Sequence, residues 1–208
     1  IVESPNFDRL TVGIWEEFFL EPTEGEMKNA VRTRLRRFMT RAFRRPVEEV
    51  LLNRYTQHAL RQIEAGMSFT GAMKESASAV LSSPRFLYLY NQPSATGKAE
   101  PMDGYDLASR MSFFLWGSIP DDELLQLAGN GDLAKPAVRT AQVSRMLASP
   151  KLKRFCDSFP SQWLQLDRIV SAVPDEIKYK DFFFAAPNYR TTMDMMMEPL
   201  LLFETVLI

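Results

Sequence analysis

The sequence of 208 residues contains a single cysteine, Cys156, and a single histidine, His58. One cysteine cannot form a disulfide within the chain, and one residue of each kind supplies too few ligands for a zinc site of cysteine and histidine. The motif C-x-x-C-H does not occur, so no c-type haem is attached covalently within these residues. We therefore expect neither a metal site nor a cofactor site in this chain.

Other signatures of chemistry are missing as well. The sequence has no glycine-rich phosphate loop, no H-E-x-x-H, no calcium-binding loop and no G-x-S-x-G. It has no run of 18 apolar residues, so we expect no membrane-spanning segment. The formal net charge of −1 gives no overall attraction to nucleic acid or to an acidic membrane. No catalytic residue can be named from the sequence.

The patterning that is present indicates helices. Apolar residues make up 46% of the sequence and charged residues 25%, as in ordinary globular domains. Apolar positions recur every three or four residues, and no useful stretch alternates with a period of two. We predict an all-α fold of about nine helices, in one large or two packed helical domains, with no significant β-sheet. The predicted helices span residues 7–20, 23–44, 47–65, 68–82, 106–116, 121–128, 136–148, 149–166 and 189–208.

One segment of low apolar content, residues 92–104, separates two groups of these helices. Its proline, serine and glycine residues favour turns and loops. We predict an N-terminal helical domain at residues 1–91, a linker at 92–104 and a C-terminal helical domain at 105–208. Because the sequence stops within an apolar helical pattern, we expect the second domain to be truncated and the chain to belong to a longer protein.

The stretch Asp106–Leu124 supplies a predicted core helix followed by a break and a second helix. Its block of four large apolar residues, 113–116, is predicted to be buried. Four positions share one face of the helical period: Leu107, Met111, Phe114 and Leu115. After the break at Gly117, three acidic residues at 121–123 begin the next helix. Acids at a helix start oppose the positive end of the helix dipole, so we interpret them as capping residues rather than catalytic ones.

Local signals also predict several helix ends. Thr23 and Glu26 have the spacing of a capping box, in which each side chain bonds a free backbone amide of the other residue. Gly66 follows the third predicted helix at a position that favours glycine. Asp103 is predicted to cap the helix that begins at residue 106, and Pro136 to open the helix at 136–148.

Seven arginines fall within fourteen residues, from Arg32 to Arg45, with no acidic residue among them. Arginine forms paired hydrogen bonds to planar anions, so this helix could present a face for an acidic partner. The alternative is internal pairing with Glu24, Glu26, Glu48 or Glu49. Nucleic acid is disfavoured because no stacking aromatic residues alternate with the arginines. The predicted partner-binding residues are Arg36, Arg37, Arg41, Arg44 and Arg45.

Three further features contain residue types that can take part in binding or chemistry. His58 lies on a predicted helix without a nucleophile nearby in sequence, so we interpret it as a surface or hydrogen-bonded residue. Cys156, next to Phe155, is predicted to be a small buried side chain. The methionines at 193–197 face several directions around the last helix and could form core or an adaptable docking surface. A methionine sulfur could also serve as an axial ligand to a haem in a neighbouring module.

Several stretches together resemble a known group of proteins. Their sequences are RAFRRPV at 41–47, SF at 68–69 leading to LSSPRFLY at 81–88, LASRMSFFLW at 107–116, IPDDELL at 119–125, MLASP at 146–150 and QWLQL at 162–166. Their order and spacing resemble the planctomycete-type cytochrome-associated proteins. These are large exported polypeptides of uncharacterised function, in which two adjacent helical domains accompany c-type haem modules. The present sequence departs from them in lacking a cysteine in residues 21–29 and in having Pro160 and Ser161 where a flexible turn is usual.

The resemblance implies an extracytoplasmic location, in the periplasm or at the cell surface, and c-type haem in a neighbouring module or partner. It supplies no catalytic residues. Our first hypothesis is a helical scaffold or interaction module that positions redox partners or subunits, a cytochrome among them. The alternative is the non-haem segment of a haem-dependent oxidoreductase whose haem module lies outside this chain, so whether the chain is part of an enzyme stays open. A basic nucleic-acid binder ranks well behind both.

Overall fold

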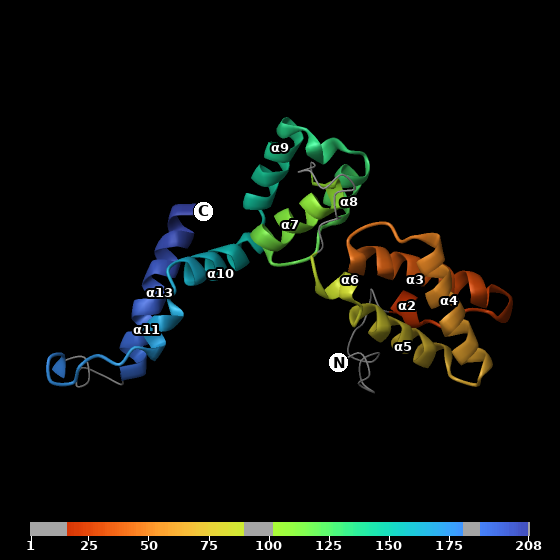
Figure 1. Ribbon diagram of the computed structural model, residues 1–208, viewed down its shortest axis with the longest axis horizontal. Coiled ribbons are helices and arrows are strands. Elements are labelled where there is room, and N and C mark those ends of the chain that lie inside the picture. Colours follow the sequence, from red (N-terminus) through yellow and green to blue (C-terminus); the bar gives the residue numbers. More distant parts are fainter. Residues whose placement is uncertain (1–15, 90–101, 181–187, 208) are drawn as a thin grey trace, which may run out of the picture. The chain divides into compact units, whose positions relative to one another are not determined.

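The structure is a computed structural model that describes residues 16–89, 102–180 and 188–207. These residues contain eleven α-helices and three short 3-10 helices, and no strand occurs among them (Figure 1). The predicted all-α class is therefore confirmed. Two single-turn helices, α6 (Pro84–Leu87) and α11 (Asp167–Ser171), account for the excess over the predicted number. Helix α11 lies between the predicted helices at 149–166 and 189–208.

The described residues form two compact units. The first takes its residues from 1–110 and 119–131, and the second from 111–118 and 132–208. Helix α7 (Gly104–Trp116) contributes its first turns to the first unit and its last turns to the second. Most of the predicted linker, residues 92–101, lies outside the described residues, so the division at 92–104 stays a prediction. Most of the predicted helix 7–20 also lies outside them, and its end forms α2 (Glu16–Phe19).

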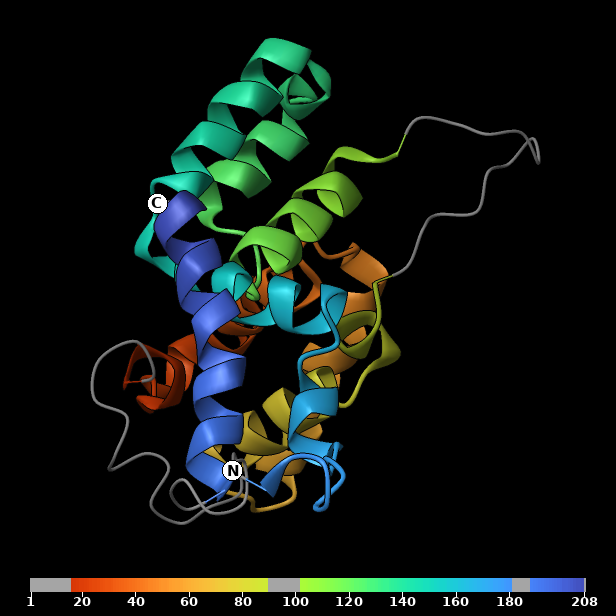
Figure 2. The same ribbon diagram turned by 90° about the vertical axis from the view of Figure 1, so that its left-hand side faces the viewer.

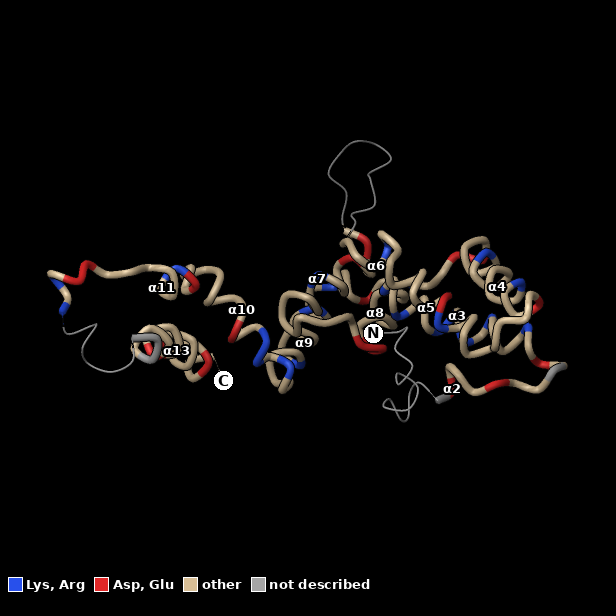
Figure 3. Tube along the Cα trace, turned by 90° about the horizontal axis from the view of Figure 1, so that it is seen from below, with Lys and Arg blue, Asp and Glu red and all other residues tan. Residues whose placement is uncertain are grey.

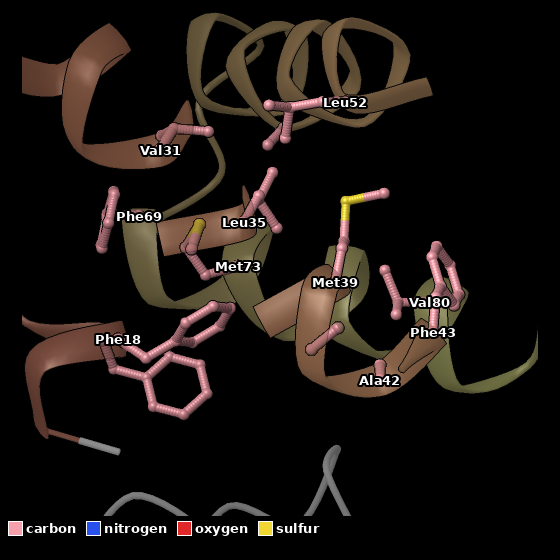
Figure 4. Close-up of a cluster of buried hydrophobic side chains, with 13 residues drawn as sticks. Phe18, Val31, Leu35, Met39, Ala42, Phe43, Leu52, Phe69, Met73 and Val80 are labelled. Carbon is pink, nitrogen blue, oxygen red and sulfur yellow. The ribbon is translucent and has the colours of Figure 1, made fainter. Parts of the chain in front are cut away.

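The core of the first unit lies among α3 (Met27–Phe43), α4 (Glu49–Glu64) and α5 (Phe69–Leu81). Val31, Leu35 and Met39 recur every fourth residue along α3 and are completely buried, as the apolar period predicts. Figure 4 shows them gathered with Leu52 of α4 and Met73 of α5. Each large apolar side chain contributes about 1.5–3 kcal/mol when it is removed from water. This cluster fixes the inward face of α3 and leaves its polar side chains outside.

Small residues of α5 allow the neighbouring helices to approach. Ala72, Ser76 and Ala77 are buried along α5, where larger side chains would force the helices apart. At the end of α4, Gly66 adopts a left-handed conformation with φ of 96°. The Met67 amide donates to the carbonyl oxygen of Gln62 at 3.0 Å, which closes the helix as predicted.

The predicted capping box at Thr23 is wrong. The Thr23 hydroxyl donates to the Glu26 carboxylate at 2.8 Å, and neither side chain caps a backbone amide. The reason is a 3-10 turn, η1 (Glu24–Glu26), that precedes α3 and shifts its start to Met27. Glu26 therefore occupies the N-cap position of α3 instead of the third position of a helix capped by Thr23.

The first unit also contains α8 (Asp122–Gly129), which packs beside the start of α7. The Asp121 carboxylate accepts a hydrogen bond from the Leu124 amide at 3.0 Å, so the predicted capping role is confirmed for this residue. Gly104 opens α7 so close to α8 that a Cβ there would lie 2.8 Å from the carbonyl oxygen of Ala128. Glycine at this position is what allows the close contact.

The second unit is built from the end of α7 with α9 (Pro136–Leu147), α10 (Lys153–Trp163), α11 and α13 (Asn188–Leu207). Pro136 is the first residue of α9, as predicted. Trp116 is buried, and its indole N–H donates to the carbonyl oxygen of Met146 at 3.1 Å. The Lys151 ammonium lies 4.6 Å from the centre of the same ring. These contacts attach the end of α7 to α9 and to the turn that follows it.

Part of the predicted core face of α7 is wrong. Phe113 is 36% exposed and Phe114 58% exposed, whereas Leu115 and Trp116 are buried. Ser112 is buried instead, because the inward face runs through the series Ala108, Ser112, Leu115 and Trp116. The Phe114 ring packs from the side against Phe155 of α10, with ring centres 5.1 Å apart.

Helix α13 lies alongside α10 and α11 (Figures 1 and 2). Phe155 and Phe159 of α10 stack with ring centres 4.9 Å apart, and Phe203 of α13 packs against both. Cys156 is buried beside them as a free thiol, as predicted, and burial raises its pKa above the ordinary value. On α9, Leu147 is exposed and Gln142 is buried.

We predict that Gly104→Ala destabilises the contact between α7 and α8. The added Cβ would press on backbone atoms of Ala128, which cannot move as a side chain can, so the free energy of unfolding should fall by about 1–3 kcal/mol. Urea unfolding of the whole chain, with hydrogen exchange of the α7 and α8 amides, measures the loss. Gly25→Ala is the matched control, because a Cβ there meets no atom within 4 Å. Equal stability of the two variants would contradict the close contact.

Candidate functional site

The arginine-rich helix α3 places its arginines around the sides that do not face the core. Figure 3 shows blue basic positions along α3 and α4 with red acidic positions on the segments nearby. On the side toward α4, Arg36 Nη1 lies 2.6 Å from the Glu49 carboxylate. Arg32 pairs with the same carboxylate and also donates to the side chain of Asn53. The internal pairing considered for Glu49 is therefore present.

Glu49 is held in its charged form by these arginines. The hydrogen bond from Arg36 lowers the pKa of Glu49 most, and the positive charges of Arg36 and Arg32 lower it further. Both arginines come from successive turns of α3, four residues apart, so they reach the first turn of α4 together. The arrangement ties α3 to the start of α4.

Two other arginines of α3 pair with acids that are distant in the sequence. Arg37 donates to Glu17 of α2 at 2.8 Å, and Arg41 donates to Asp122 of α8 at 2.8 Å. The side chains in both pairs are largely exposed, with 68% exposure for Arg37. Exposed pairs of this kind contribute about 0–1 kcal/mol each. The two pairs therefore add little to the stability of the contacts that α3 makes with α2 and α8.

Arg44 has a different environment, because it is buried with only 5% of its surface exposed. It ends α3 in the left-handed conformation, with φ of 60°. Its guanidinium donates to the carbonyl oxygens of Arg85, Phe86 and Tyr88, each at 3.0 Å, and to that of Ala42 at 3.2 Å. These bonds satisfy carbonyl groups at the end of α6. Burial foremost, and the neighbouring positive charge of Arg45, lower the pKa of Arg44 from its ordinary value.

Arg45 connects the end of α3 to the start of α7. Its Nη2 lies 2.8 Å from the Asp103 carboxylate and 2.7 Å from that of Asp106, and its guanidinium lies over the Tyr105 ring. Asp103 occupies the N-cap position, where its carbonyl oxygen accepts from the Leu107 amide at 2.9 Å. Its carboxylate binds Arg45.

Arg34, which we did not predict as a site residue, also bonds within the unit. Its guanidinium donates to the carbonyl oxygens of Phe18 and Leu20 and lies over the Phe69 ring at 5.3 Å. All five predicted partner-binding arginines therefore contact groups of the first unit itself. Their binding to a separate partner stays a prediction, and Arg36 and Arg37 are the most exposed of the five.

A pocket of about 360 Å³ lies beside this arginine-rich face. Phe38 and Phe86 give it apolar walls, and Arg37 and Arg41 line it with their carboxylate partners close by. Its size falls within the range of small-molecule sites, which starts at about 300 Å³. The charge of both arginines is nevertheless balanced by acidic groups of the unit.

Other predicted positions are spread over the chain. His58 is half-buried on α4, with Nε2 3.5 Å from the Glu75 carboxylate, so it is a surface residue with a partner. Across the described ranges, no group of three or more His, Cys, Asp and Glu side chains is arranged to hold a metal ion. None of the helices in the described part of the chain combines the length and hydropathy that a membrane crossing requires.

The methionine-rich helix α13 exposes a row of apolar side chains. Met195, Leu202 and Val206 are 50%, 64% and 78% exposed, and they recur with the helical period along one stripe. Pro199 lies in the same stripe and is half-buried. Side chains of α13 are thus exposed and available for the predicted docking.

An all-α chain with two compact units and helices in this order is compatible with two adjacent helical family domains. Residues 30–91 match the family described as PSD5, protein of unknown function (DUF1595), and residues 102–208 match PSD4, protein of unknown function (DUF1592). The second match covers more than half of the chain, so the chain belongs to the DUF1592 family. The two families are the planctomycete-type cytochrome-associated ones that the sequence motifs resemble. No curated protein and no solved structure matched the chain.

We expect Arg44→Ala to lower the free energy of unfolding of the first unit by about 3 kcal/mol. The substitution removes four hydrogen bonds to buried and partly buried carbonyl groups, and each such bond contributes about 0.5–1.5 kcal/mol. Arg44→Lys should recover only part of the loss, because an ammonium group lacks the planar fork of donors. Hydrogen exchange of the α3 and α4 amides measures the effect.

Arg37→Ala is the control for Arg44, since it removes an exposed arginine from the same helix and should cost less than about 1 kcal/mol. Equal losses in the two alanine variants would refute the assignment of Arg44 as the buried connection between α3 and α6.

The Glu49 pairs should make stability depend on pH in acid. Because the pKa of Glu49 is lower in the folded chain, its contribution is complete above the ordinary pKa of glutamate and is lost as the pH falls through the folded-state pKa. Glu49→Gln should therefore be less stable than the wild type at pH 7 and equal to it in strong acid. Urea midpoints measured from pH 7 to pH 2 provide the comparison. A difference between Glu49→Gln and wild type that does not change with pH would contradict the charge pairing.

Proposed function

We propose that this chain is a helical interaction module of an exported, c-type cytochrome-linked protein or assembly, and that it positions redox partners or subunits. The single observation that carries the proposal is the apolar stripe of α13. The family membership supports the setting, since the sequence motifs resemble proteins in which such domains accompany c-type haem modules. The haem would lie in a neighbouring module or partner, outside the cytoplasm.

The stripe has the properties of a protein-binding surface. Met195, Leu202 and Val206 project along one stripe of α13. Met193 and Met197, which are 44% and 40% exposed, lie on the other side of the helix, because two residues of an α-helix turn through about 200°. Apolar surface of this kind costs free energy in water, and soluble proteins that expose it in a continuous patch use it for binding. Methionine side chains are flexible and polarizable, so they can fit the irregular surface of a partner.

The arginine-rich helix has a secondary part in this proposal. Because its guanidinium groups bond within the first unit, an acidic partner would have to compete with Glu17, Glu49 or Asp122 for them. Arg36 and Arg37 remain exposed enough to attract such a partner from a distance, which raises the rate of association more than its strength. Docking through α13 needs no internal bond to be broken.

Two single substitutions in α13 test the proposal with the full-length protein purified gently from its native cells. We expect the wild type to bring with it a haem-containing protein or module, seen as a c-type Soret band in the same complex. Where the haem protein is a separate subunit, Leu202→Glu should reduce its recovery at least tenfold, because a charge would be buried at the interface. Thr205→Glu adds the same charge to an exposed position beside the stripe and should leave recovery within twofold.

Absence of haem from the wild-type complex would refute the cytochrome setting. Equal recovery with both glutamate variants would refute docking through the stripe. Where the haem module belongs to the same polypeptide, the matching readout is protection of α13 from limited proteolysis, which Leu202→Glu should abolish and Thr205→Glu should keep.

A further inference from the structure

A second pocket, of about 490 Å³, opens in the first unit among α4, α5 and α6. Four basic side chains line it, Arg54, His58, Arg61 and Arg85, together with the hydroxyl-bearing Tyr55 and Ser83. None of the described residues that line it is acidic. The pocket is thus a concentration of positive charge in a chain whose net charge is −1.

The regular spacing of α4 produces this arrangement. Arg54, His58 and Arg61 are separated by four and then three residues, so they share one face of the helix. The opposite face of α4 is fixed by Leu52 and Ala59, which are completely buried in the core. Arg85 reaches the same pocket from α6, whose position is set by the bonds of Arg44 to its carbonyl groups.

The arginines of this pocket have fewer acidic partners than those of α3, while His58 faces the Glu75 carboxylate at 3.5 Å. Within the described residues, the guanidinium groups of Arg54 and Arg61 have neither a hydrogen bond nor an ion pair. Arg85 forms one ion pair, with the Glu48 carboxylate at 3.4 Å, and both side chains of this pair are largely exposed. Like charges gathered in one hollow repel each other, and a bound anion would convert that repulsion into attraction. By contrast, Arg37 and Arg41 beside the 360 Å³ pocket already have acidic partners.

The chemistry of the lining selects the kind of anion. Arginine binds phosphate oxygens with two parallel N–H groups, and tyrosine and serine hydroxyls donate further bonds. The Ser83 oxygen accepts from the Arg85 amide at 3.3 Å, which leaves its own hydrogen to donate. The pocket is several times larger than one water site, and Leu51 and Ala79 give it an apolar wall beside the basic groups.

We propose that this pocket binds a small, multiply charged phosphate compound. The basic groups would hold its phosphate oxygens, and the wall formed by Leu51 and Ala79 would contact the organic part of a phosphate ester. This site is separate from the apolar stripe of α13 and does not depend on the proposed docking function.

Titration calorimetry of the whole chain at constant ionic strength tests the proposal, with inorganic pyrophosphate and fructose 1,6-bisphosphate as probes. We expect saturable binding of one molecule of at least one probe per chain. Tighter binding of the bisphosphate assigns a phosphate ester as the ligand class, and binding of pyrophosphate alone assigns an inorganic phosphate. Arg54→Gln combined with Arg61→Gln should weaken the binding at least tenfold.

Arg36→Gln combined with Arg37→Gln is the matched control. It also removes two positive charges from the first unit, but at positions outside the pocket. It should therefore change the affinity by less than twofold. Citrate, which has a similar charge but carboxylate groups, should bind at least tenfold more weakly than the tighter phosphate probe. The proposal is overturned if neither probe saturates, if both double variants weaken binding equally, or if citrate binds as tightly as phosphate.

Discussion

The buried guanidinium of Arg44 is the interaction on which the first unit depends most. It ends α3 in a left-handed conformation that an arginine adopts at a cost, and it donates to four carbonyl oxygens, three of them in partly buried bonds. By holding α6 against the end of α3, it also sets the position of Arg85 in the basic pocket. Other arginines bind carboxylates: Arg32, Arg37 and Arg41 connect α3 to α4, α2 and α8, and Arg45 connects the end of α3 to α7.

The fold class follows from local information in the sequence. The stripe of Val31, Leu35 and Met39 is visible as a period, and Gly66 and Pro136 mark helix ends through their own backbone preferences. The inward face of α7 does not follow in the same way. Phe113 and Phe114 are as apolar as the buried Trp116, so only the packing of neighbouring helices decides which of them faces inward. Tertiary contacts also override the local signal at Thr23, where a 3-10 turn displaces the helix start.

In the candidate sites, too, local contacts can be predicted from the sequence and distant ones cannot. Glu49 lies close enough in sequence to the arginines to be named as a partner beforehand. Asp122 and Asp106 lie far along the chain, and nothing in their surroundings indicates that they meet Arg41 and Arg45. The spacing of Arg54, His58 and Arg61 on one helical face is visible in the sequence, but the approach of Arg85 and the lack of acidic partners are not. The density of charge in the sequence therefore favours α3 over α4 as the candidate site.

The arginines of α3 bond to groups of their own unit, and the exposed stripe of α13 is the proposed docking surface. The most direct test compares hydrogen exchange of the isolated chain with that of the chain in its native assembly. We predict added protection of the amides of α13, Asn188–Leu207, and unchanged exchange along α3, Met27–Phe43. Added protection on α3 with none on α13 would contradict the account.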